Sequence, residues 1–104
     1  MLRGTVIDIY ARNQNGSNAL HMAIKRENKL VFKSLIDSNY DLNYPKNNGV
    51  TALGIAALAD HKRFFVELLD AGADPHWVNE KGIGALYLAI KGKSRVLIQY
   101  LVNL

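Results

Sequence analysis

Apolar side chains recur along the chain in three short groups with the same spacing. The groups are Leu20, Ala23 and Ile24, then Leu53, Ala56 and Ala57, then Leu86, Ala89 and Ile90. In each group the i, i+3, i+4 spacing places the side chains on one face of an α-helix. Residue types that serve as N-caps stand just before them, at Asn18, Thr51 and Gly84. The pattern predicts three short amphipathic helices, one beginning after each of these residues.

A second apolar group follows each of the first three after a polar break. These groups are Val31, Phe32, Leu35 and Ile36, then Phe64, Phe65, Leu68 and Leu69, then Leu97, Ile98, Leu101 and Val102. Asn28 and Ser94 are suitable caps for the start of such a helix. Asn39 and Gly72 are suited to its end, because both residue types tolerate the left-handed conformation that often terminates a helix. The chain is therefore expected to be all-α, built from pairs of helices.

The helix pairs repeat with a period of 33 residues. Shifting the sequence by 33 places Gly16, Gly49 and Gly82 in one column, and Ala23, Ala56 and Ala89 in another. The period predicts repeats over 13–45, 46–78 and 79–104, the last cut short, with 1–12 as the end of a preceding repeat. The alanine column is expected to let neighbouring helices approach closely.

This pattern resembles the ankyrin repeat, whose period is also 33 residues. The middle copy carries the resemblance best, with Gly49, Thr51, Leu53, Ala56 and Ala57, followed by His61, Leu68, Leu69, Gly72, Ala73 and Asp74. The first copy keeps Gly16, Leu20, His21, Ala23 and Asp41, and the third keeps Gly82, Leu86 and Ala89. The resemblance implies an ankyrin-repeat solenoid of helix-turn-helix units, of about three repeats.

The sequence departs from the family pattern at the positions that link neighbouring repeats. Alanine replaces the proline of the pattern in all three copies. In the family, a threonine and a histidine of the pattern are linked in a hydrogen-bonded network between repeats. Here Thr51 has no partner histidine, because Gly54 occupies that position, and His21 has Asn18 in place of the threonine. Gly84 and Tyr87 replace both residues in the last copy. We therefore expect a stack that is less regular and less stable than one that follows the pattern throughout.

Both ends of the chain fall within a repeat. Leu2 aligns with the end of a second helix, and Ile7-Asp8-Ile9 with the loop after it. Repeat arrays normally need polar outer repeats, so Leu97, Ile98, Leu101 and Val102 are expected to be exposed in the last copy. Either the chain belongs to a longer array or a partner covers this end, and we favour the first.

Composition narrows the class of protein further. Hydrophobic residues make up 49% and charged residues 21%, a globular balance, and there is no cysteine. The absence of cysteine excludes disulfides and thiolate chemistry and suits a reducing compartment. No apolar run is long enough for a membrane span. The sequence favours an intracellular protein, cytoplasmic or nuclear, without membrane insertion.

No group of residues predicts catalysis, a metal or a cofactor. His21 and His61 lie where the family uses histidine structurally, and His76 lies in a loop. The segment Lys91-Gly92-Lys93-Ser94 lacks the upstream glycine of a phosphate-binding loop. The chain is expected not to be an enzyme.

The resemblance places partner binding on the concave side, formed by the turns and the outer side of the first helices. The candidate residues are Arg12, Gln14, Asn15, Ser17, Lys25, Arg26, Asn47, Asn48, Val50, Leu58, Ala59, Trp77, Val78, Lys81, Ile83 and Lys91. Val50, Leu58, Ala59 and Ile83 would form an apolar centre with basic residues on both sides, as at protein interfaces.

These positions favour a non-enzymatic module for protein–protein interaction. The alternative is a structural spacer or assembly element packed through its open repeat ends. Binding of nucleic acid through Lys25, Arg26, Lys29, Lys33, Lys91, Lys93 and Arg95 is disfavoured, because acidic residues interrupt the basic ones. Trp77 aligns with Tyr44, and both are expected to pack between neighbouring loops. The alternative is that Trp77 serves as a binding anchor.

Overall fold

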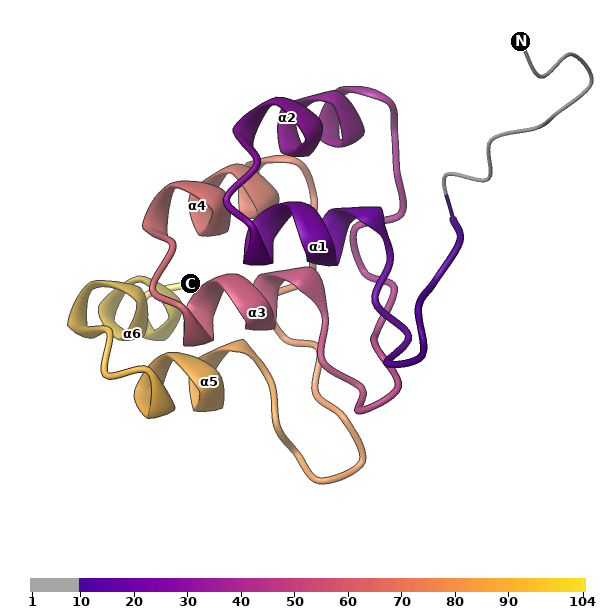
Figure 1. Ribbon diagram of the computed structural model, residues 1–104. Coiled ribbons are helices and arrows are strands. Elements are labelled where there is room, and N and C mark those ends of the chain that lie inside the picture. Colours follow the sequence, from indigo (N-terminus) through magenta and orange to yellow (C-terminus); the bar gives the residue numbers. More distant parts are fainter. Residues whose placement is uncertain (1–9) are drawn as a thin grey trace, which may run out of the picture.

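Six α-helices arranged in three pairs make up the fold (Figure 1). The computed structural model describes residues 10–104. The first helices of the pairs are α1 (Ala19–Lys25), α3 (Ala52–Leu58) and α5 (Ala85–Lys91), and the second are α2 (Lys29–Asp37), α4 (Lys62–Asp70) and α6 (Arg95–Val102). Over these residues the only bridge between extended segments joins Val78 and Gly84. The predicted all-α architecture is confirmed. The alignment of Leu2 and Ile7-Asp8-Ile9 with the end of a preceding repeat concerns residues outside the described range.

The helices form two layers that follow the order of the sequence. Helices α1, α3 and α5 stack side by side, with α3 packed against both of its neighbours, and α2, α4 and α6 form the layer beside them (Figure 1). A tight turn joins the helices of each pair, and in it Glu27, Asp60 and Lys93 adopt left-handed φ angles of 55°, 57° and 59°. The longer turns that precede the first helices project to one side of the stack (Figure 1). No helix in the described part of the chain is long and apolar enough to cross a bilayer.

The helices begin and end at the residues that the sequence indicates. The side chains of Asn18, Asn28 and Ser94 accept hydrogen bonds from backbone N–H groups in the first turns of α1, α2 and α6. Thr51 and Gly84 are also N-caps, although neither supplies a side-chain cap bond. Asn39 and Gly72 have φ angles of 61° and 104°, as expected where α2 and α4 terminate.

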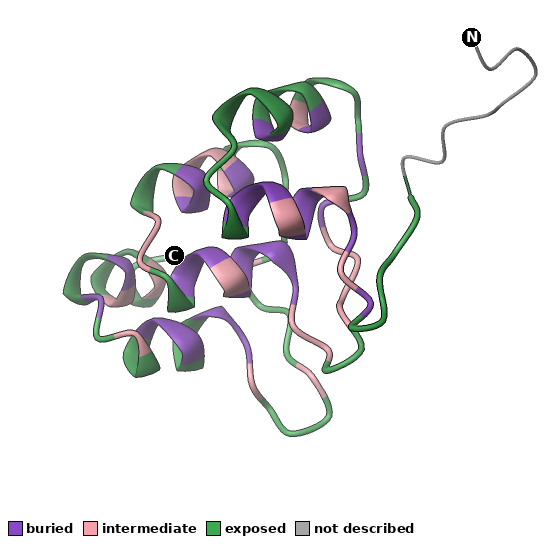
Figure 2. Ribbon diagram, viewed as in Figure 1, coloured by how far each residue is buried: buried purple, intermediate pink, exposed green. Residues whose placement is uncertain are grey.

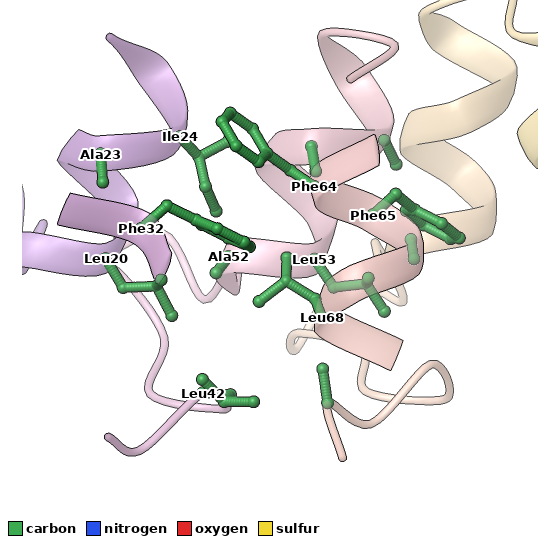
Figure 3. Packing of buried hydrophobic residues seen from close by; sticks show 14 of the residues in the cluster. Leu20, Ala23, Ile24, Phe32, Leu42, Ala52, Leu53, Phe64, Phe65 and Leu68 are labelled. Atoms are coloured by element: carbon green, nitrogen blue, oxygen red, sulfur yellow. The ribbon is translucent and has the colours of Figure 1, made fainter. Parts of the chain in front are cut away.

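Close packing between the repeats depends on small residues in one layer and aromatic residues in the other. Ala56 and Ala89 are fully buried, which confirms the predicted role of the alanine column. In the other layer the rings of Phe32 and Phe64 have centroids 4.4 Å apart. Figure 3 shows Phe32, from α2, reaching toward Ala52 of the next repeat. The core is therefore continuous across the repeat boundaries.

Exposure in the third repeat differs from the prediction in two ways, because the core extends into this repeat on one side and its other side is uncovered. Leu97 was expected to be exposed but is completely buried, and Leu86 and Ile90 are 43% and 56% exposed although the helical pattern placed them on the apolar face. Their equivalents in the first repeat, Leu20 and Ile24, are 1% and 0% exposed because the second repeat packs on them. Ile98 and Leu101 are partly buried, and Val102 is exposed as expected. Figure 2 shows exposed positions along α5, whereas α1 and α3 are exposed only at their C-terminal ends.

Candidate functional site: the concave groove

The turns and the outer side of the first helices enclose a groove of about 1300 Å³. Every repeat contributes to it, because equivalent positions of the 33-residue period line up along the stack. The predicted site residues that line this groove are Ser17, Lys25, Arg26, Asn47, Asn48, Val50, Leu58, Ala59, Trp77, Val78, Lys81, Ile83 and Lys91. The structure therefore brings most of the predicted site together on one surface, and their role in binding stays a prediction.

Three predicted residues lie in the exposed turn before α1, outside the groove lining. The guanidinium of Arg12 lies 4.7 Å from the centre of the Tyr44 ring, a cation–π contact. The backbone carbonyl groups of Gln14 and Asn15 accept hydrogen bonds from Asn47, at 2.8 and 3.0 Å. These three residues take part in contacts between neighbouring turns.

The floor of the groove includes apolar residues that the sequence reasoning missed. Met22, Ile55 and Leu88 occupy one column of the repeat and line the groove, as does Tyr87, which is 50% exposed. Met22, Ile55 and Leu88 lie three residues before Lys25, Leu58 and Lys91, so the helical i, i+3 relation to predicted residues could have identified them. Met22 and Ile55 are partly buried and Leu88 is buried, so these residues serve the core as well as the groove.

Side-chain amides fasten the turns to one another and so fix the shape of the groove wall. Asn47 Nδ2 donates to the carbonyl of Gln14, and Asn79 Nδ2 donates to the carbonyl of Asn48, at 2.8 and 2.9 Å. Gly49, at the tip of the middle turn, has a φ of 82°, and a Cβ atom there would collide with the Cβ of Asn79. Glycine is required at this tip for both reasons.

Trp77 joins the groove wall to the preceding turn. Its indole Nε1–H donates to the carbonyl of Gly49 at 3.0 Å, and 37% of the residue remains exposed in the groove. This contact supports the predicted packing between loops. Trp77 remains partly exposed, and its role as a binding anchor stays a prediction.

His21 ties the first helix to the wall of the groove. Its Nδ1 accepts the backbone N–H of Asn18, so Nε2 carries the hydrogen and donates to the carbonyl of Tyr44 at 2.9 Å. The pKa of His21 is lowered to about 4, mainly by burial; the hydrogen bond to the Tyr44 carbonyl acts in the opposite direction, and the positive charge of Lys46 adds a smaller lowering effect. A neutral, doubly hydrogen-bonded imidazole of this kind has a structural role, as the sequence predicted.

The acidic side chains and histidines of the described residues are not clustered. No group of three or more His, Asp or Glu side chains within residues 10–104 is close enough to hold a metal ion. Asp60 accepts a hydrogen bond from Ser94 and pairs with Lys62, and these contacts, the Ser94 bond first, lower the pKa of its carboxyl. This cluster connects the turn of the second repeat to the N-cap of α6.

Comparison with known families decides the classification. The family described as ankyrin repeats (3 copies) matches residues 2–76 of the chain, well over half of its length. The chain is a member of the ankyrin-repeat family. Helices α5 and α6 lie beyond the matched residues but keep the same turn and helix order, so the ankyrin stack continues through them. No curated protein matches the sequence. Ankyrin repeats are in general protein-interaction modules and typically have no enzymatic activity.

Proposed function

We propose that this ankyrin chain is a non-enzymatic recognition module that binds a protein partner in its concave groove. One observation carries the proposal: Leu58, the last residue of α3, lines the groove and is 45% exposed. Val50 and Ile83, which precede the N-terminal ends of α3 and α5, line the same groove and are partly buried against the core. An apolar centre with a polar rim is the usual anatomy of a protein interface.

The test compares two leucines that are exposed on different sides of the stack. Leu58→Glu places a charge in the groove, whereas Leu30→Glu places the same charge on α2, where Leu30 is exposed and does not line the groove. In a pull-down from cell extract, proteins captured by the unmodified chain should be lost with Leu58→Glu and kept with Leu30→Glu. Retention of every captured protein by Leu58→Glu would show that the groove is not the binding surface.

A second candidate function is supported by the exposed face of the last repeat. Leu86 and Ile90 project from α5 at positions that the next repeat covers elsewhere in the stack. A helix pair of the same kind, packed on this face, would make the chain a spacer or assembly element. Ile90→Glu distinguishes the two functions. Captured proteins that are lost with Ile90→Glu but kept with Leu58→Glu would favour assembly through this face.

A further inference from the structure

The charged side chains of this protein are distributed unevenly between the groove and the rest of the surface. Residues 10–104 contain twelve Lys and Arg and eight Asp and Glu side chains. Five of the basic residues line the groove, namely Lys25, Arg26, Lys46, Lys81 and Lys91, together with a single acidic residue, Glu80. The remaining surface has seven of each sign. The net positive charge of the described residues therefore resides in the groove.

The basic residues of the groove have no acidic partner within the described part of the chain. The ion pairs in residues 10–104 join Lys33 to Asp37 and Lys62 to Asp60, and neither pair lines the groove. Lys46 was not among the predicted site residues, and it places a positive charge on the wall between the two basic flanks. Like charges around a concave surface reinforce one another and raise the local concentration of anionic groups.

We infer that the groove selects an acidic polypeptide segment, one in which acidic residues flank an apolar side chain. This inference rests on the proposed function and specifies the chemistry of the partner. The acidic residues would lie against the basic rim, and the apolar side chain would pack on Leu58 and Ile55 between them. Charge complementarity of this kind mainly determines which partner is accepted, while the apolar contact contributes affinity.

The arrangement fits an acidic protein better than a nucleic acid. Several of the basic residues considered for nucleic acid do not reach the groove, including Lys29, Lys33, Lys93 and Arg95. Single-stranded nucleic acids are bound on aromatic side chains that stack with successive bases. The exposed aromatic residues of the groove are Tyr87 and Trp77, and the Trp77 indole already donates to the carbonyl of Gly49, whereas the floor residues Met22, Ile55 and Leu88 are aliphatic or thioether side chains. An aliphatic side chain of a peptide complements this floor.

Trp77 provides a direct measurement of occupancy, because it is the only tryptophan in the sequence and lines the groove. The probe is a short peptide in which glutamate residues flank one central leucine. A matched peptide has glutamine at every glutamate position. Titration of the full chain at about 0.15 M salt, followed by Trp77 fluorescence, should give a Kd for the acidic peptide that is at least about tenfold lower than that for the neutral peptide.

Two sets of charge-neutralising variants separate the effect of charges in the groove from the effect of the net charge of the protein. Lys25→Gln, Lys81→Gln and Lys91→Gln together remove three charges from the groove. The control, Lys29→Gln, Arg63→Gln and Arg95→Gln, removes three charges from exposed positions outside it. The groove set should weaken binding of the acidic peptide about tenfold or more, and the control set by no more than about twofold. All six residues are exposed, so both proteins should fold, which a urea melt verifies.

Each alternative outcome contradicts a different statement. Equal Kd values for the acidic and neutral peptides, with both lost in Leu58→Glu, would refute acidic selectivity and leave the groove as a protein-binding site. If neither Leu58→Glu nor the groove set alters binding, both the acidic selectivity and the role of the groove as the protein-binding site are refuted. Tighter binding of an oligothymidylate than of the acidic peptide would refute the inference in favour of nucleic acid. If neither peptide binds, the inference is wrong, and the pull-down with Leu58→Glu still decides the proposed function.

Discussion

At the scale of single residues, His21 and the turn glycines show how one residue can serve both the stack and the groove. His21 reaches from α1 to the carbonyl of Tyr44 in the next loop, and it also lies at the groove wall. Gly49 allows the middle turn to lie against Asn79 of the following turn. The shape of the groove therefore depends on residues whose immediate contacts are structural.

The low pKa of His21 predicts a pH dependence of stability. The imidazole has a pKa of about 4 in the folded chain and 6.5 without the fold, so the unfolded chain takes up the proton first as the pH falls. The contribution of His21 to the free energy of unfolding should be constant above about pH 7.5 and should fall by about 3 kcal/mol as the pH is lowered from there to 4. Urea denaturation across this window measures the change. In His21→Gln the fall should be largely absent, and an undiminished fall would assign the effect to other groups.

The turn glycines predict different costs for the same substitution. Gly49→Ala introduces both a left-handed alanine and a collision with Asn79, whereas Gly82→Ala, at a φ of 77°, meets no neighbouring atom. Both variants should lower the free energy of unfolding by about 1 kcal/mol for the backbone conformation. Gly49→Ala should lose about 1 kcal/mol more, from displacement of the turn. Equal urea midpoints for the two variants would mean that the turns do not rest on one another.

At the scale of helices, the stack depends on how closely α1, α3 and α5 approach. The alanine column makes this approach possible, since Ala56 and Ala89 leave no surface exposed. The facing layer is filled instead by rings such as Phe32 and Phe64. The two layers therefore respond differently to a change of side-chain size.

Enlarging the alanine of α3 should destabilise the stack. Ala56→Leu forces α3 away from its neighbours and should cost about 1–3 kcal/mol of unfolding free energy. Ala59→Leu is the matched control, because Ala59 is exposed beyond the end of the same helix. The urea midpoint should fall for Ala56→Leu and change little for Ala59→Leu. An unchanged midpoint for Ala56→Leu would contradict the close approach of the helices.

The sequence predicts helices better than it predicts exposure. Caps such as Asn18 and Asn39 act locally, so their residue types indicate the ends of α1 and α2 without knowledge of the rest of the fold. Whether Leu97 or Ile90 is buried depends on which neighbouring repeat packs on it, and the pattern within one helix does not contain that information. Lys46 was missed as a groove residue for the same reason, because its position depends on how neighbouring turns pack.

At the scale of the whole molecule, equivalent positions of the repeat contribute unequally to the free energy of unfolding. The reason is that another repeat packs on the outer side of the first helix in the first two repeats but not in the third. The interactions in a repeat protein are mainly those between adjacent repeats. A position that is central in the first repeat is therefore at the surface in the third.

Leu20 and Leu86 predict how large this inequality is. They occupy the same column and have the same side chain, but Leu20 is buried against the second repeat and Leu86 is partly exposed. Leu20→Ala should cost about 2–4 kcal/mol of unfolding free energy, and Leu86→Ala less than about 1 kcal/mol. Chemical denaturation of the two variants measures both. Similar losses would indicate that α5 is covered in solution, for instance by a second copy of the chain, which a dependence on protein concentration would reveal.

The placement of charge in the groove also has a kinetic consequence. Because the excess positive charge lies on one side of the molecule, the protein has an electric dipole directed through the groove. An approaching acidic chain experiences a torque that turns it toward this side before contact. Added salt would then slow association and leave the dissociation rate almost unchanged, since the apolar contact at Leu58 governs release. The same five basic residues would shorten the search for a partner, whatever the final strength of the complex.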